Sequence, residues 1–363
     1  MNKEVISDKQ GIAIMVLFMI GPSSVSLAGV EAGRDIWLAV ILSMLMALPI
    51  LLVFCKLHIL YPGKDFFDIV IICFGKFIGK GIIILYVWNL FVTVTTTFRN
   101  FGEFITTVSL IHTPMVVPIV FFGALCVFVA KSGIEVLGRW GNFFIPIVIL
   151  FTVVLILLLV PEMNEANIRP LFSNGVKAIF HGTIKLYSFP FAQLVIFSMI
   201  FTNFRDRKSP YRIYLWSLLI AGIVLLVTFT SSLLVVGVDS ISNMYYPTYT
   251  AISRVEVMKI GRLEILSATI FSLGGFVKIS SHIFAICIGL TKIFKCSDYR
   301  FIVVPVTLLL INQAYFTWDS AMSFYEFDGE MMLYFAFPFR TIFPIILLIA
   351  GRLKKNSRLV GME

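Results

Sequence analysis

Residues 10–31 read QGIAIMVLFMIGPSSVSLAGVE, an apolar run interrupted in its middle by Gly21, Pro22, Ser23 and Ser24. About 20 apolar residues are enough to cross a bilayer as a helix. Glycine relaxes the backbone and proline removes a hydrogen-bond donor, so this motif predicts a membrane helix that breaks in mid-span. The alternative is a simple proline kink, which would have no part in binding.

The composition outside this stretch is also that of a membrane protein. Of the 363 residues 59% are hydrophobic and 13% are charged, which excludes a water-soluble enzyme of this size. The 36 Phe exclude a disordered chain. The net charge of +9 is what basic loops between membrane helices give, and we expect no nucleic-acid binding. Ten apolar segments follow one another, at about 10–31, 36–58, 81–110, 113–130, 134–160, 176–203, 211–238, 262–292, 299–317 and 331–352.

A second interruption lies in the sixth segment, where Tyr187 is followed by Ser188, Phe189, Pro190 and Phe191. The two interrupted segments each open a block of five, and five is odd, so the second block must run opposite to the first. Matching interruptions in inverted repeats indicate a binding site near the bilayer midplane. We therefore predict an all-α integral membrane protein of ten transmembrane helices. Residues 1–363 would form one domain, with repeats at about 10–160 and 176–352.

The distribution of Lys and Arg predicts the orientation. With the N-terminus inside, the inner connections carry nineteen basic residues and the outer ones seven, which places both termini in the cytoplasm. Residues 65–79 suggest an interfacial helix on the inner side. Residues 245–261 form the longest outer connection, and they either cap an outward cavity or make an ordinary surface loop.

The break in the first segment has a chemistry of its own. Ser23 and Ser24 are good N-caps for a half-helix that restarts after Pro22. Free N–H groups at such a helix start, together with its dipole, favour a carboxylate. We therefore expect this motif to hold an anionic group of a ligand.

The third segment carries a polar stripe. Its members recur at spacings of four, three, four and three, which puts them on one helix face: Asn89, Thr93, Thr96, Asn100 and Glu103. Arg99 and Glu103 are four apart and can pair, which lowers the cost of about 2.5–3.5 kcal/mol for each charge at the bilayer centre. Two readings stay open. The pair fixes helix packing, or Glu103 faces a cavity and binds an amine or carries a proton.

Lys278 is a further charge within an apolar segment, and Ser280, Ser281 and His282 follow it closely. Its ammonium needs acceptors. One hypothesis is that unwound carbonyls near Gly21 provide them and that the ammonium takes the place of a sodium ion. Snorkelling or pairing with a carboxylate such as Glu103 is the alternative. Arg340, in the tenth segment, is interpreted as structural.

Motifs of catalysis are missing from the sequence. It contains no HExxH, GxSxG, glycine-rich phosphate loop or EF-hand spacing. The four His are scattered and the five Cys have no CxxC spacing, so we expect no metal site, no cofactor and no enzymatic activity.

Several stretches in a fixed order carry a family resemblance. They are SDKQGIAIMVLFMIGPSSV with AGRDIWLAVILS, NIRPLFSNGVKAIFHGTIKLYSFPFAQ, YYPTYTAISRVEVMKIGRLEIL and FVKISSHIFAICIGL. In these the chain resembles the endospore germination permeases, the B subunits of spore germinant receptors, within the amino acid–polyamine–organocation superfamily. It departs from the family pattern at Gln193, where an acidic residue is more usual.

The resemblance implies a LeuT-like fold of five plus five inverted helices. It also implies a pocket for a small germinant, usually an amino acid, within the inner spore membrane. Partners would be an A-type membrane subunit and a C-type lipoprotein subunit. The implied pocket residues are Gly21, Pro22, Ser23, Ser24, Asn100, Glu103, Ser188, Phe189, Pro190, Phe191, Ser280 and Ser281.

Three functions remain open from the sequence. The chain senses a germinant, works as a proton-coupled amino-acid transporter, or serves as a scaffold with an empty pocket. A sensor and a transporter need the same pocket, so the sequence does not separate them.

Overall fold

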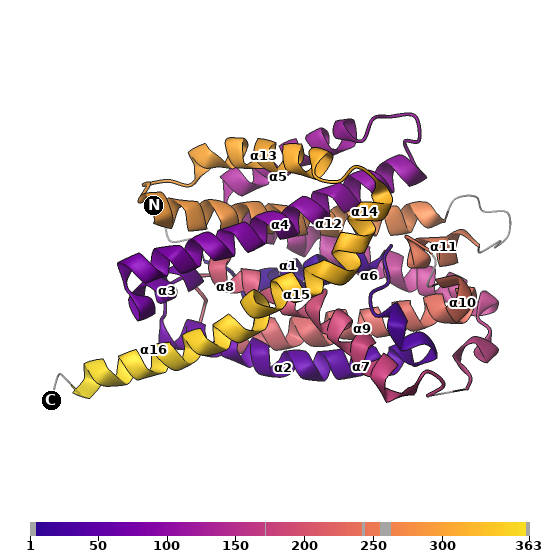
Figure 1. The fold of residues 1–363 in the computed structure, drawn as a ribbon, viewed down its shortest axis with the longest axis horizontal. Helices are drawn as coiled ribbons and strands as arrows, with labels where there is room; N and C mark the ends of the chain where they lie inside the picture. Colours follow the sequence, from indigo (N-terminus) through magenta and orange to yellow (C-terminus); the bar gives the residue numbers. More distant parts are fainter. Residues whose placement is uncertain (1–4, 171, 242–243, 255–262, 361–363) are drawn as a thin grey trace.

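The computed structural model describes residues 5–170, 172–241, 244–254 and 263–360, which form helices and turns with one isolated β-bridge between Ile6 and Phe204. Figure 1 shows the helices as a bundle along one long direction. In chain order the elements are α1 (Asp8–Ser23), η1 (Val30–Asp35), α2 (Ile36–Leu60), α3 (Phe66–Phe74), α4 (Lys76–Val108), α5 (Val116–Ser132), α6 (Ile134–Leu159), η2 (Val160–Glu162), η3 (Glu165–Ile168), α7 (Gly175–Ser188), η4 (Phe191–Val195), α8 (Ile196–Ile200), α9 (Ser209–Val236), α10 (Val238–Ile241), α11 (Pro247–Ser253), α12 (Glu264–Phe294), η5 (Arg300–Ile302), α13 (Val303–Phe316), α14 (Ala321–Glu326), η6 (Phe327–Met331), α15 (Met332–Phe337), η7 (Pro338–Ile342) and α16 (Phe343–Val360).

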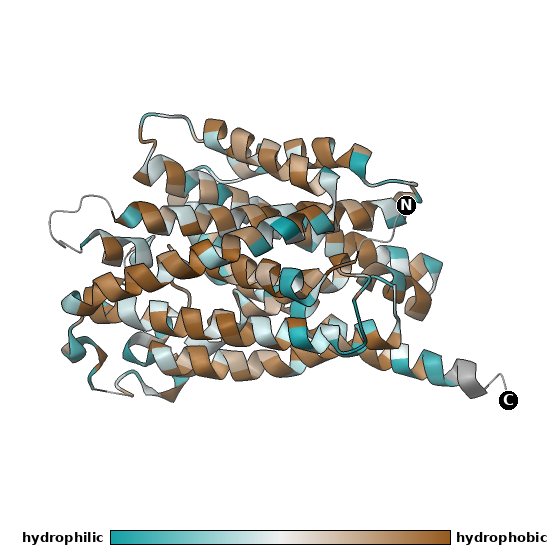
Figure 2. Cartoon of the chain, turned by 180° about the vertical axis from the view of Figure 1, so that it is seen from behind, coloured by the Kyte–Doolittle hydropathy of each residue, from teal (hydrophilic) through white to brown (hydrophobic). Residues whose placement is uncertain are grey.

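Length and hydropathy identify the membrane spans. Among the described residues seven helical stretches are long and apolar enough to cross a bilayer: Val30–Leu60, Lys76–Val108, Ile134–Glu162, Gly175–Ile200, Ser209–Val236, Glu264–Phe294 and Ala321–Asn356. Hydrophobic residues cover these helices along most of their length (Figure 2). The other three predicted segments coincide with the shorter helices α1, α5 and η5–α13. The chain is thus a multi-pass membrane protein, while the count of ten crossings stays a prediction.

The first interruption differs from its prediction in one respect. A capping box between Ser7 and Gln10 starts α1, which contains Pro22 and ends at Ser23. No half-helix restarts at Ser24, because the chain then runs without helix until the 3-10 element η1 begins at Val30. The motif therefore presents a helix C-terminus to the protein interior, and not the N-terminus that was expected to hold a carboxylate.

The second interruption also presents a helix C-terminus. Helix α7 ends at Ser188, Phe189 is extended (φ −136°, ψ 116°), and the chain resumes as the 3-10 element η4 and the five-residue helix α8. Both interrupted segments thus bring the carbonyl end of a helix into the bundle.

Helices α1 and α12 form the centre of the bundle. Helix α1 packs against α12, α9 and α6, and nearly all of its residues from Gly11 onward are buried. The two backbones meet at Gly21 and Gly274, where a Cβ on Gly21 would lie only 2.4 Å from the Gly274 Cα. This contact fixes the height of Lys278, one turn further along α12.

The last span is longer than predicted and is not regular. Helical structure runs from α14 to α16 and includes two π-helical elements, η6 and η7. The sequence had placed residues 318–330 in an outer loop and begun the tenth segment at 331. Single π turns inside helices often occur at functional sites, because the extra residue turns side chains that would otherwise face away.

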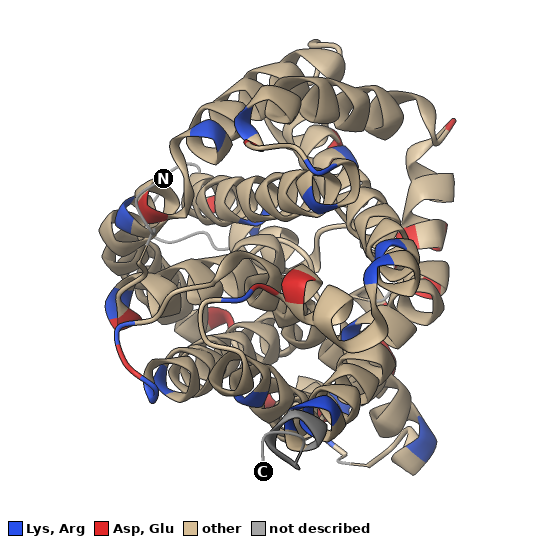
Figure 3. Cartoon of the chain, turned by 90° about the vertical axis from the view of Figure 1, so that its left-hand side faces the viewer, with Lys and Arg blue, Asp and Glu red and all other residues tan. Residues whose placement is uncertain are grey.

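The chain ends lie at the same end of the bundle in Figure 1. Figure 3 views that end, and Lys and Arg are distributed around it. Helix α3, predicted as an interfacial helix, also lies there and packs on α4 and α16. The arrangement suits an even number of crossings with both ends in the cytoplasm, and the orientation itself stays a prediction.

Candidate functional site

A cavity of about 260 Å³ lies inside the bundle. Its walls come from five places: the segment from Pro22 to Glu31, the middle of α4, the end of α7 with η4, the centre of α12, and the run from α14 to η7. The connection between α10 and α11 closes part of the remaining side. All the elements with broken or π-helical backbone therefore meet at one place.

Helix α4 contributes part of its polar stripe. Thr93, Thr96 and Asn100 line the cavity, and the Asn100 Oδ1 is buried without a hydrogen-bond partner among the described residues. Gln193, across the cavity on η4, has a buried Oε1 in the same condition. These two oxygens are acceptors that a ligand could use.

Lys278 reaches the cavity from α12, and its side chain is 1% exposed. The Nζ atom lies 4.3 Å from the centre of the Phe189 ring and 5.3 Å from that of Phe18. Within the described part of the chain this ammonium has cation–π contacts but no hydrogen-bond acceptor. The carbonyls near Gly21 do not accept from it, because Gly21 packs directly on Gly274.

Arg340 reaches the same cavity from η7. Its guanidinium donates to the Ser188 carbonyl at 3.0 Å and to the Thr93 hydroxyl at 3.2 Å. It therefore satisfies the carbonyl end of α7 at the second interruption, where the helix dipole favours a cation. Arg340 thus has the structural contacts that the sequence suggested, and in addition it lines the cavity.

Asp328 adds a carboxylate to the same cavity. It lies on η6, lines the cavity beside Thr96, and interacts electrostatically with both Lys278 and Arg340. Asp328 is not among the residues predicted from the sequence, because hydropathy assigned residue 328 to a loop. The sequence offers one signal for Asp328, which is that an acid stands twelve residues before the buried base Arg340. The two π turns that carry these residues cannot be read from hydropathy.

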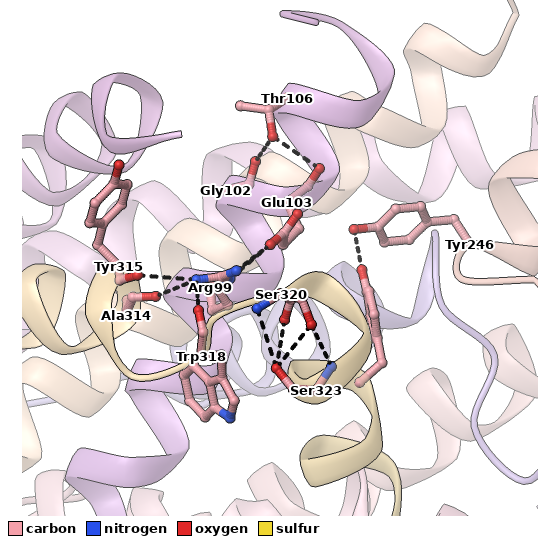
Figure 4. A network of polar contacts seen from close by, with 11 residues as sticks. Arg99, Gly102, Glu103, Thr106, Tyr246, Ala314, Tyr315, Trp318, Ser320 and Ser323 are labelled. Carbon is pink, nitrogen blue, oxygen red and sulfur yellow. Dashed lines mark hydrogen bonds and ion pairs between the residues drawn. The ribbon is translucent and has the colours of Figure 1, made fainter. Parts of the chain in front are cut away.

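Arg99 and Glu103 form the internal ion pair that was one of the two sequence readings. The Arg99 Nε donates to Glu103 Oε1 at 2.8 Å, and Nη2 lies 2.7 Å from the same oxygen. The guanidinium also donates to the carbonyls of Ala314, Tyr315 and Trp318 at 3.2–3.3 Å (Figure 4). It therefore caps the end of α13, and neither member of the pair lines the cavity.

Ser23 and Ser24 of the first interruption also lie outside the cavity lining. Ser23 donates to the Met19 carbonyl at 3.0 Å and Ser24 to that of Gly21 at 2.7 Å. Ser24 is further held by α12, because Ser267 donates to its carbonyl at 2.7 Å. Of this motif only Pro22 lines the cavity.

Ser188 and Phe189 also line the cavity, but Pro190 and Phe191 do not. On α12, Ser281 donates to the Val277 carbonyl at 2.8 Å, and neither Ser280 nor Ser281 lines the cavity. Ser280, two residues beyond Lys278, lies on another face of the helix. A binding role for all these residues stays a prediction.

An ion pair and tyrosines close another side of the cavity. Glu31 pairs with Lys185, which joins the segment after α1 to α7. The Tyr325 hydroxyl donates to the Tyr246 hydroxyl, and Tyr246 is labelled in Figure 4. The Tyr325 ring stacks on the Tyr245 ring, with 4.5 Å between the ring centres. Part of the connection expected to cap the cavity thus does line it, and its residues 255–261 lie outside the described ranges.

Comparison with known proteins places the chain. Residues 5–320 match the family of spore germination proteins described as spore permeases. The chain belongs to this family. It is 26% identical over 366 residues to spore germination protein KB of Bacillus subtilis (strain 168), covering 99% of this chain and 97% of that one. Spore germination protein YndE of the same strain is 21% identical, with 97% and 98% covered.

The fold of this spore germination protein is shared with a transporter. Mhp1, a nucleobase-cation-symport-1 family transporter solved in a closed conformation with bromovinylhydantoin bound, superposes with a TM-score of 0.67 at 14% identity. The match covers 92% of this chain and 79% of Mhp1. The LeuT-like fold that the resemblance implied is thereby confirmed.

The cavity of the spore germination protein is suited to a small polar ligand with an anionic group. Among the described residues three cations and two carboxylates line it. Glu31 and Lys185 pair with each other, while the ammonium of Lys278 has no acceptor. A buried ammonium in that condition is costly, and a ligand carboxylate would remove the cost by accepting its hydrogen bonds. The cations that face the deeper part of the cavity are thus side chains of α12 and η7.

Proposed function

We propose that this chain is the B-type membrane subunit of a spore germinant receptor and that it binds a small amino acid in the cavity between α4, α7, α12 and η7. The observation that carries the proposal is the pair of buried cations, Lys278 and Arg340, on two walls of one cavity beside a carboxylate, Asp328. Both charge types of an amino acid have counterparts there.

The ligand would act through the elements that meet at the cavity. Arg340 donates to Ser188 on α7, and the Glu31–Lys185 pair joins α7 to the segment after α1. A carboxylate that draws the Arg340 guanidinium toward it changes how tightly α7 is held. A ligand shifts such an equilibrium only by its difference in affinity for the two states. The receptor would report the state with α7 rearranged.

The experiment is a binding measurement on the purified full chain in lipid nanodiscs. We expect one or a few members of an L-amino-acid panel to raise the melting temperature, because a ligand at 100 times its Kd stabilises a protein by about 2.7 kcal/mol. Lys278→Met should weaken this binding. Its control is Lys64→Met, since Lys64 is exposed and outside the cavity. Absence of a shift with every amino acid would favour the scaffold function.

A proton-coupled transporter is the second candidate, and the likeness of the fold to Mhp1 favours it. Uptake of radiolabelled ligand by vesicles that contain this chain alone separates the two. Concentrative uptake driven by a proton gradient would replace the sensor proposal by the transporter. Binding without uptake supports the sensor.

The proposal includes an A-type membrane subunit and a C-type lipoprotein subunit in the inner spore membrane. One surface suits a membrane partner. Along α13 a continuous outward face consists of Val304, Leu308, Leu309, Asn312, Gln313 and Phe316, all exposed. Asn and Gln side chains within a bilayer are stabilised by hydrogen bonds from another helix. We assign this face to a transmembrane helix of the A-type subunit.

A further inference from the structure

Charged side chains do not balance within the cavity. In the described ranges two carboxylates line it, those of Glu31 and Asp328, against three cations, those of Lys185, Lys278 and Arg340. Glu31 and Lys185 are paired with each other. Deeper in the cavity Asp328 therefore faces two cations, and one positive charge is in excess.

Nothing described next to the cavity removes this excess. The nearby carboxylate of Glu103 is bound to Arg99 outside the cavity lining. His282 contacts the Lys278 carbonyl through Nδ1, at 2.7 Å, and its ring stacks on Phe18, so it brings no negative charge. The carbonyl ends of α1 and α7 carry only partial charges, and Ser23, Ser24 and Arg340 already donate to them. An uncompensated charge at this depth is unfavourable.

We propose that the ligand of this cavity carries one net negative charge, and that it is an amino acid with an acidic side chain. The inference rests on the proposed function and narrows it. The two ligand carboxylates would pair with Lys278 and Arg340, and the ligand ammonium would pair with Asp328. A neutral zwitterion, by contrast, would leave the excess positive charge in place.

Two further groups fit the ammonium of such a ligand. Asn100 Oδ1 and Gln193 Oε1 are buried acceptors without partners in the described structure, and both line the cavity. Gln193 is 6% exposed and stands where relatives were expected to carry an acid. A carboxylate there would cancel the excess charge, so the neutral amide is consistent with an anionic ligand in this chain.

The test compares ligands of nearly equal shape and different charge. Binding of L-glutamate and L-glutamine, and of L-aspartate and L-asparagine, is measured by calorimetry on the full wild-type chain in nanodiscs. We expect one acid to bind at least about tenfold more tightly than its amide, because the amide leaves a buried cation unpaired. Equal or tighter binding of both amides would overturn the inference while leaving the proposed function intact. Failure of all L-amino acids to bind would instead remove the proposed function.

Variants that change the cavity charge test the same idea without depending on absolute affinity. Lys278→Met removes the excess, so the ratio of acid to amide affinity should fall about tenfold. Asp328→Asn increases the excess, so that ratio should stay or rise even if both affinities fall. Asp319→Asn, at an exposed acid between α13 and α14, is the control and should leave the ratio unchanged. An unchanged ratio in Lys278→Met would also overturn the inference.

Discussion

Two buried charge clusters touch the same helix, α4, and they are built in opposite ways. The cluster of Arg99 and Glu103 is complete, since the guanidinium reaches one carboxylate and three carbonyls. The cluster of Lys278, Arg340 and Asp328 lies around a cavity. Its ammonium has two aromatic faces and the charge of Asp328 nearby, but no hydrogen-bond acceptor among the described residues. The first cluster is a structural brace, and the second is incomplete in the way a binding site is.

The largest expected effect comes from breaking the complete cluster. Arg99→Met leaves Glu103 buried without its partner and three carbonyls of the α13 end without a donor. Removing one partner of a buried pair costs about 3–5 kcal/mol. Thermal unfolding in detergent should show this loss.

A matched control for Arg99→Met lies on α6. Arg139 and Glu135 are also four residues apart, at 3.8 Å, but their side chains are 74% and 38% exposed. Arg139→Met should cost at most about 1 kcal/mol. Similar losses in the two variants would contradict the description of the Arg99 cluster as a brace. The double variant Arg99→Met with Glu103→Met should recover part of the stability.

A substitution in the incomplete cluster should change ligand affinity more than stability. Lys278→Met removes an ammonium that has no acceptor in the described structure, so the stability of the ligand-free chain should be kept or raised. Ligand affinity should fall about tenfold to a hundredfold, the value of a hydrogen bond to a charged group. Calorimetry measures the affinity and thermal unfolding the stability, with Lys64→Met as the control. A destabilised variant with unchanged affinity would show that Lys278 is also a brace.

Glu103→Gln distinguishes the two clusters most directly. The sequence left open a ligand or proton role for Glu103, whereas the structure places it outside the cavity lining. Glutamine keeps an acceptor for Arg99 but loses the charge, so we expect a stability loss of about 1–2 kcal/mol. Ligand affinity should change by less than about twofold, because groups without shared contacts show little energetic coupling. A large rise in Kd with normal stability would return Glu103 to the binding site.

The sequence was informative where hydropathy and helical period decide the structure. The apolar segments, the break at Ser188 and the stripe from Thr93 to Asn100 follow from composition and spacing alone. The sequence did not locate Asp328, because a π turn changes the face on which a residue lies without changing hydropathy. It also assigned the Gly21–Ser24 motif a free helix N-terminus, although Ser23 and Ser24 instead donate to the carbonyls of the turn they close.

The α13 face gives the smallest effect on this chain and depends on the Arg99 brace. Arg99 binds the carbonyls at the end of the helix that carries Asn312 and Gln313 on its outer face. Asn312→Leu with Gln313→Leu should change the stability of the isolated chain by no more than about 0.5 kcal/mol, because both side chains are exposed. Co-purification with an A-type subunit should fall, since each interhelical hydrogen bond in a membrane is worth about 0.6 kcal/mol and up to about 1.7 kcal/mol. Leu308→Ile on the same face is the control, because it changes shape without changing polarity.

Undiminished co-purification of the Asn312→Leu, Gln313→Leu variant would mean that the partner docks elsewhere. If Arg99→Met weakens co-purification as well, the brace and the partner face act as one unit, separate from the cavity.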